Sequence, residues 1–224
     1  MLYRLAIIAG ISASMAFAQE ETPDHHLRAA AEVFHEIMAA PDRGIPHDLL
    51  ERARCVVIVP GFKKAAFVVG GEYGRGIAMC RHADAWGGPA ALRLSGGSFG
   101  VQIGVESTDI ILLVMNDRGM EKLAGDKFTV GADASVAAGP VGRTAAADTD
   151  ARLNAEILSY SRAKGVFAGI SLAGTVVTKD DGEDRKIYGH EVSNRAIIRG
   201  EVEAPPAAAP LREELARYTP LRKG

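Results

Sequence analysis

The chain has 224 residues, of which 47% are hydrophobic and 24% are charged, and its formal net charge is -2. This is the composition of an ordinary globular protein with one sizeable core, and the weak charge balance excludes nucleic acid as the expected partner. Residues 51–100 hold seven Lys or Arg against three Asp or Glu, whereas residues 101–160 hold five against nine. Residues 51–100 therefore form either a mildly basic face for anionic headgroups or an ordinary mixed surface.

The first 18 residues read as a secretory signal peptide. A short basic start at Met1–Arg4 precedes the mostly apolar stretch Leu5–Phe17, and Ala16-Phe17-Ala18 fits an A-x-A cleavage site. We therefore expect an exported protein, periplasmic or peripheral on the cell envelope if the source is a Gram-negative bacterium. The expected organisation is a signal peptide, a polar lead-in, a main domain and a Pro/Ala-rich spacer with a terminal helix, over residues 1–18, 19–26, 27–200 and 201–224.

An amphipathic helix is predicted over Leu27–Ala40, and a short second helix from Pro46 to Ala53. Two interpretations of the first helix remain open: its apolar stripe packs on a sheet, or it inserts into a bilayer surface. The stripe contains the apolar residues Leu27, Ala30, Ala31, Phe34, Ile37 and Met38.

Strands dominate the middle of the chain. Cys55–Val59, Ala65–Val69 and Ile77–Cys80 are β-rich, and the glycines of residues 70–76 predict a hairpin turn with positive φ. Residues 86–89 are expected to form a loop. Between 99 and 105, apolar residues alternate with Gly100, Gln102 and Gly104, and such a bare strand face suggests close approach by another backbone, a bend or a ligand. A polar turn at 106–109 and a buried strand at 110–115 are expected to follow.

After residue 116, the sequence predicts both helices and strands. We expect a short helix at 117–123, a strand at 127–130, a hairpin formed by 154–161 and 166–177, a helix near Ile197-Ile198 and a terminal helix at 211–218. Helices near the ends and strands between them indicate an α+β fold. Its core is a mainly antiparallel, Gly-rich β-sheet, open or barrel-like, flanked by N-terminal and C-terminal helices.

Two cysteines, Cys55 and Cys80, are the only ones in the chain. In an oxidising compartment they could form a disulfide, but two separate buried thiols are the favoured interpretation. No second pair suggests a zinc site.

One stretch of the chain matches a catalytic sequence motif. Residues 96–100 match G-x-S-x-G around Ser98, and Asp180, Asp184 and His190 follow in the order of an α/β-hydrolase triad. A nucleophile elbow needs a helix after the serine, but the period-two pattern after Ser98 predicts a strand. A serine hydrolase is therefore the weakest alternative, and we predict no enzyme.

Cofactor and metal sites are not predicted. The glycines of 70–76 lead into a strand instead of the helix that a phosphate loop requires. The adjacent His25 and His26 lie in a polar lead-in, where solvated side chains are expected. The acidic run 180–184 lacks the ligand spacing of an EF-hand and is interpreted as a solvated turn, and residues 180–185 as a charged loop or the start of a helix.

Six ordered sequence blocks together resemble the SYLF domain, the lipid-binding domain of the Ysc84 family. The resemblance covers roughly residues 27 to 200, and the blocks are residues 55–64, 67–76, 96–104, 108–116, 128–142 and 160–171. It implies non-catalytic binding to phospholipid membranes without a cofactor. In relatives, an amphipathic N-terminal helix and basic residues contact the membrane. The corresponding lipid-binding residues here are Leu27, Phe34, Met38, Lys63, Lys64, Arg75 and Arg81.

The expected partner is an anionic phospholipid membrane surface. Eukaryotic relatives bind phosphoinositides, and some bind actin, but an exported bacterial protein would meet neither, so actin binding and phosphoinositide specificity are not expected. The alternative is a structural envelope protein that binds an unidentified protein partner through its glycine-faced strands.

Overall fold

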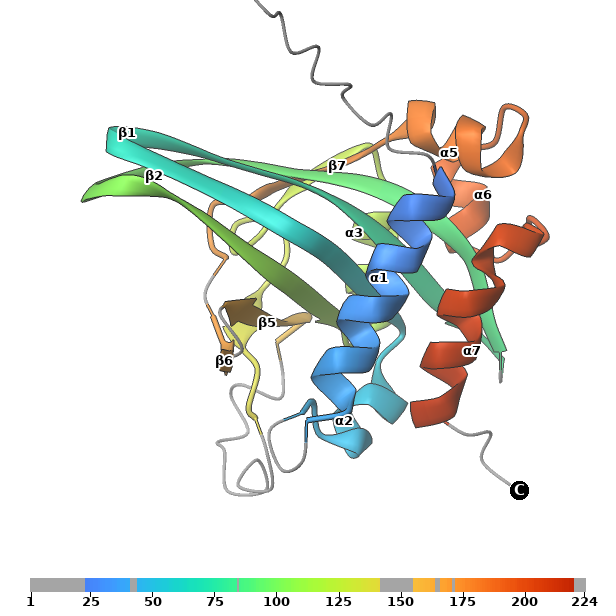
Figure 1. Ribbon diagram of the computed structural model, residues 1–224. Helices are drawn as coiled ribbons and strands as arrows, with labels where there is room; N and C mark the ends of the chain where they lie inside the picture. The colour runs from blue at the N-terminus through green and yellow to red at the C-terminus, as the bar shows by residue number, and fades with distance from the viewer. Residues whose placement is uncertain are drawn as a thin grey trace, which may run out of the picture.

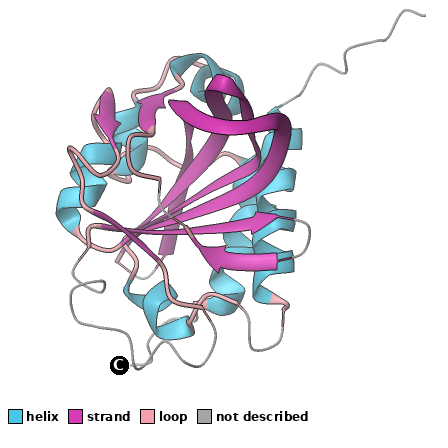
Figure 2. Cartoon of the chain, turned by 90° about the vertical axis from the view of Figure 1, so that its left-hand side faces the viewer, coloured by secondary structure: helices cyan, strands magenta, loops and turns pink. Residues whose placement is uncertain are grey.

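The fold is known from a computed structural model that describes residues 23–40, 44–83, 85–141, 155–163, 166–170 and 172–219, with side chains at 23, 66–69, 98–105 and 167 outside the description. The predicted signal peptide lies outside the described residues. The α+β prediction is confirmed: a mostly antiparallel sheet is curled into a half-barrel, with helices at both ends of the chain (Figure 1). Figure 2 shows how strongly the strands curl.

Two very long strands form the centre of the sheet. β1 (Cys55–His82) and β2 (Ala85–Val114) pair antiparallel from Cys55↔Val114 to His82↔Ala85, with three register shifts along the way. The predicted turn at 70–76, loop at 86–89 and turn at 106–109 are therefore wrong, because all three lie inside these strands. None of the glycines between 70 and 76 has a positive φ.

The β1–β2 ribbon bends back on itself, and glycines permit the close approach. A Cβ atom on Gly74 would lie 2.7 Å from a methyl carbon of Val59 and 2.7 Å from a ring carbon of Phe62, and one on Gly76 would lie 2.8 Å from Val59. The second half of β1 therefore lies against its first half. In Figure 1 both strands run to the left-hand tip and return. The glycines serve close packing, and this is why they do not mark a turn.

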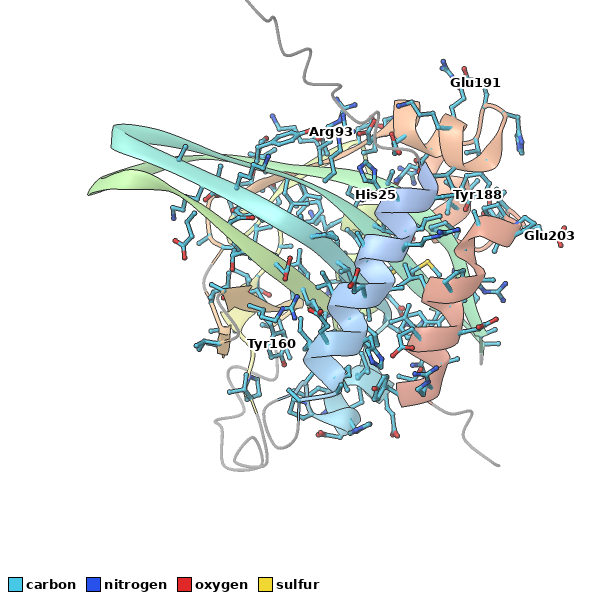
Figure 3. The ribbon with its side chains drawn as sticks, in the orientation of Figure 1. His25, Arg93, Tyr160, Tyr188, Glu191 and Glu203 are labelled. Atoms are coloured by element: carbon cyan, nitrogen blue, oxygen red, sulfur yellow. A yellow bond between two sulfur atoms is a disulfide. The ribbon has the colours of Figure 1, made fainter. Side chains whose placement is uncertain are left out.

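The base of the ribbon, where the two halves of β1 meet, is closed. The backbone N–H of Arg81 donates to the carbonyl oxygen of Arg54 at 2.8 Å. A disulfide joins Cys55 to Cys80, which are 0% and 1% exposed, instead of the two separate thiols that the sequence favoured (Figure 3). The two residues are brought together by the bend of β1, which the sequence does not reveal.

Shorter strands extend the ribbon on both sides. Residues 109–114 of β2 pair with β5 (Ile157–Ala163), and residues 92–95 pair with β7 (Val176–Lys179). The expected hairpin is confirmed in part: β5 pairs with β6 (Val166–Gly169), but β7 is a separate strand. The outer strands are β3 (Lys127–Thr129), which pairs with β7, and β4 (Val136–Ala138), which runs parallel to β5.

Helices cover both faces of the base. α1 (Pro23–Met38), α2 (His47–Arg52) and α7 (Ala209–Tyr218) share one apolar core with one set of alternate β1 residues, such as Ile58 and Met79. On the other face, α6 (Asn194–Ile198) shares a second core with Val57 and Leu112, and the buried Leu123 of α3 (Asp117–Leu123) belongs to it. α5 (Asp181–Tyr188) contacts β2 and α1, and a 3-10 turn, η2 (Pro206–Ala208), leads into α7. Among the described helices, none combines the length and apolarity needed to span a bilayer.

Candidate functional site

A pocket of about 370 Å³ lies where the N-terminal end of α1, the two halves of β1 and the start of α5 meet. Figure 3 shows His25 at this end of α1, with Arg93 nearby on β2. The polar side chains lining the pocket are those of His25, His26, Lys63, Tyr73, Arg75, Asp180 and Glu183.

Cationic side chains reach this region from three passes of the ribbon. Lys63 comes from the first half of β1, Arg75 comes from its second half, and Arg93 stands directly opposite Arg75 on β2. Like charges placed opposite each other on a sheet are destabilising unless something compensates them. Asp180 supplies that compensation, because Arg93 donates two hydrogen bonds to its carboxylate, each 2.6 Å long.

The ion pair keeps Asp180 ionised. Asp180 is only 3% exposed, and burial alone would raise the pKa of its carboxyl group. The hydrogen bonds from Arg93 and from the backbone N–H of Glu183 outweigh burial and lower that pKa below its usual value. Asp180 also caps the N-terminus of α5.

Residues 180–185 do begin a helix, which was one of the two interpretations, but the prediction that the acidic run 180–184 is solvated is wrong. Glu183 and Asp184 are 4% and 0% exposed, because α5 buries them against β2 and α1. Glu183 lies 3.2 Å from His26 Nδ1 and 3.4 Å from Lys186 Nζ. Asp184 accepts a hydrogen bond from the backbone N–H of Ala91 at 2.7 Å, and burial raises its pKa to about 7.

The charges left uncompensated beside the pocket are positive. Asp180 and Glu183 already have cationic or imidazole partners. Arg75 donates to the Tyr73 hydroxyl at 3.2 Å, and Lys63 makes no ion pair with any described residue. Both cations therefore keep donors available for an anion of suitable size, such as a phosphate group.

The structure separates the four basic residues predicted to act together. Lys63 and Arg75 line the same pocket, but Lys64 lies in a second hollow, of about 450 Å³, where its Nζ is 3.9 Å from Glu72. Adjacent residues of a strand point to opposite faces, which explains the division of the two lysines. Arg81 instead lies over the Trp86 ring, 4.7 Å from its centroid.

Of the three apolar residues predicted to contact lipid, two are fully buried and one is partly buried. Leu27 and Phe34 are 0% exposed, and Met38 packs partly buried against the same core. The stripe of α1 therefore packs on the sheet, which was the other interpretation of its periodicity. No sequence motif assigns Tyr73, His25 or Arg93 to a site, although the pairing of Arg75 with Arg93 in two continuous strands places Tyr73, Arg75 and Arg93 on one face.

The local structure contradicts a nucleophile elbow at Ser98. This residue lies inside β2 and pairs with Gly70, and the strand continues to Val114 before any helix begins. Asp180 is engaged by Arg93. Within the described ranges, no group of three or more His, Cys, Asp or Glu side chains is arranged to hold a metal ion.

The structure thus combines a curled half-barrel sheet with a pocket lined in part by basic side chains, and comparison with known proteins assigns the chain to a family. The Ysc84 family model, described as "Las17-binding protein actin regulator", matches residues 95–218. The chain belongs to the Ysc84 family, as the sequence resemblance predicted.

Named relatives come from yeast and mammals. Protein YSC84 of Saccharomyces cerevisiae is 34% identical over 174 residues, which are 76% of this chain and 37% of that protein. LAS seventeen-binding protein 3 of the same species is 33% identical over 174 residues, covering 76% of this chain and 38% of that protein. SH3 domain-containing YSC84-like protein 1 of Homo sapiens is 32% identical over 181 residues, covering 80% and 53%. The chain thus spans about half the length, or less, of these relatives.

Proposed function

We propose that this chain is a non-catalytic module that binds anionic phospholipid headgroups at a membrane surface. The observation that carries the proposal is the pair Lys63 and Arg75, which face one pocket while the neighbouring carboxylates are already compensated. A phosphate group matches the donors of both side chains. Each basic side chain close to an anionic membrane contributes about 1 kcal/mol, and screening by salt reduces this contribution.

Vesicle co-sedimentation tests the proposal. We expect binding to vesicles that contain phosphatidylserine, weaker binding as salt is raised, and little binding to pure phosphatidylcholine. Absence of binding to the anionic vesicles at both low and moderate salt would refute the function.

A matched pair of variants tests the site. Arg75→Gln should weaken binding about fivefold, the equivalent of about 1 kcal/mol. Arg118→Gln removes the same charge from an exposed residue of α3, outside the pocket, and should leave binding unchanged. Equal effects of the two substitutions would show that only net charge matters.

We also propose that the protein works in an oxidising compartment, the periplasm or the outer surface of the cell envelope. The buried disulfide between Cys55 and Cys80 supports this, because such bonds persist mainly in exported proteins. Alkylation of protein isolated from its source cells, with and without prior reduction, tests the compartment. Both cysteines should react only after reduction and unfolding, and thiols found without reduction would contradict export.

A protein partner is the second candidate, favoured by the family description and by the name of the yeast relative, both of which refer to binding of Las17. Those names concern longer proteins, and this chain would use only the part it shares with them. A pull-down from envelope extract distinguishes the candidates, because a protein partner should remain bound after lipid is extracted.

A further inference from the structure

The far end of the β1–β2 ribbon lacks the strands that flank its base. Pairing of β2 with β7 ends at Ser95, and pairing with β5 begins at Asp109. Between these points, the only described partner of β2 is β1. In Figure 1 this two-stranded tip projects to the left, beyond the helices. Isolated two-stranded ribbons are marginal in water, so this tip is expected to need a further partner.

The tip carries no charge. No Lys, Arg, Asp or Glu occurs between Lys64 and Glu72 on β1 or between Arg93 and Glu106 on β2. A Cβ atom on Gly97 would meet nothing within 4 Å, so the ribbon faces open space there. A projecting segment without charged residues is a candidate interaction surface. Alanines aside, the apolar residues of the two segments beyond the pairing with β7 are Phe67, Val68, Val69, Phe99, Val101, Ile103 and Val105.

Basic and aromatic residues border the charge-free segments. Lys63 and Lys64 precede the first segment, and Tyr73 and Arg75 follow it; all four are exposed, Tyr73 by 46%. Lysine and arginine are attracted to anionic headgroups, and tyrosine is enriched at membrane–water interfaces. An apolar tip with such a border matches the cross-section of a bilayer surface, in which an apolar layer lies beneath a charged one.

We propose that the tip of the β1–β2 ribbon enters the headgroup region of an anionic bilayer, while Lys63 and Arg75 contact its phosphate groups. This inference rests on the proposed membrane binding and identifies the segment that penetrates. The ribbon thereby takes the membrane-contacting role that the family resemblance implies for α1, whose apolar stripe packs in the core.

Fluorescence quenching by brominated lipid tests the location. Phe99→Trp places a tryptophan in the tip, and Val166→Trp places one at a 66% exposed residue of β6. The native Trp86 is 5% exposed and serves as a constant background in both variants. Anionic vesicles containing brominated lipid should quench the emission of Phe99→Trp and leave that of Val166→Trp unchanged. If both variants bind vesicles but Phe99→Trp is not quenched, the tip inference fails and membrane binding stands; if neither binds, both fail.

Charge insertion provides the second test. Phe99→Asp should weaken vesicle binding at least about tenfold, because it removes apolar area and introduces a negative charge where the tip would meet anionic lipid. Val166→Asp introduces the same charge on β6 and should not change binding. Circular dichroism and thermal unfolding verify that both variants fold. A Phe99→Asp variant that dissociates a dimer but binds vesicles normally would identify the tip as a self-association surface and overturn the proposal.

Discussion

The base and the tip of the β1–β2 ribbon both lack charged residues, but their surroundings are opposite. At the base, residues 55–59 and 110–114 are 0% exposed, because β5 and the helices of both faces cover them. At the tip, each strand has only the other as its described strand partner. The absence of charge therefore does not by itself determine what a segment does in this protein. The number of layers around it decides whether it stabilises the fold or is left for a partner.

Removing the disulfide at the base is expected to have the largest effect. The bond links residues separated by 25 positions, and closing a loop of that length stabilises a protein by about 3.5 kcal/mol. Replacing Cys55 and Cys80 together with alanine should lower the free energy of unfolding by about that amount, measured by urea denaturation. Reductant should then destabilise the wild type and leave the variant unaffected. An unchanged wild type under reducing conditions would contradict the prediction.

The next largest effect concerns Asp184 of α5, which accepts a hydrogen bond from Ala91 of β2. Its pKa is raised in the folded protein to about 7, mainly by burial, from an ordinary value near 3.8. The folded state thus favours the protonated form, so the associated stability is present below pH 4 and is lost as pH rises through 7. Between pH 4 and pH 8, wild-type unfolding free energy should fall relative to Asp184→Asn, by on the order of 3 kcal/mol. Denaturation curves across this range measure it, and parallel pH profiles would exclude the effect.

A pair of glycine substitutions compares base and tip directly. Gly74→Ala would bring a methyl group within 2.7 Å of Val59 and Phe62. We expect this substitution to lower the free energy of unfolding by about 2 kcal/mol. Gly97→Ala has no neighbour within 4 Å to collide with and should change stability little. Thermal unfolding of both variants provides the measurement. Similar costs at the two positions would show that the tip is as tightly packed as the base.

The smallest effect separates the adjacent lysines at the border of the tip. Lys63 makes no ion pair with a described residue, whereas Lys64 lies 3.9 Å from Glu72. Lys63→Gln should therefore weaken vesicle binding about fivefold, and Lys64→Gln less, because Glu72 already offsets part of its charge. Co-sedimentation at low salt compares them. If both substitutions weaken vesicle binding equally, the side of the ribbon on which a lysine lies does not affect binding.

Local patterns were sufficient for much of the fold. The helix at 117–123 begins and ends where its sequence indicates, and the α1 and α7 periodicities identify both terminal helices. The glycines at 74 and 76 were misread, because a turn and a close approach both select glycine. Only the contact with Val59 on the other half of β1 distinguishes the two cases, and this contact depends on the bend.

The site was predictable to a smaller degree. Alternation along a strand would have separated Lys63 from Lys64, since neighbouring side chains face opposite ways. The pairing of Arg93 with Asp180 joins residues 87 positions apart, and no local pattern contains such information. The burial of Asp184 likewise depends on how α5 docks, whereas an acidic run in isolation indicates solvent exposure.

The covalent link across the base has a mechanical consequence. If the protein were pulled by its two ends, tension would pass directly from Cys55 to Cys80, and the chain between them would carry no load. The extended length of the oxidised chain would then be roughly 80–90 Å shorter than that of the reduced chain, at 3.3–3.6 Å per residue. The β1 half of the tip would consequently remain within a closed loop while the rest of the molecule is stretched.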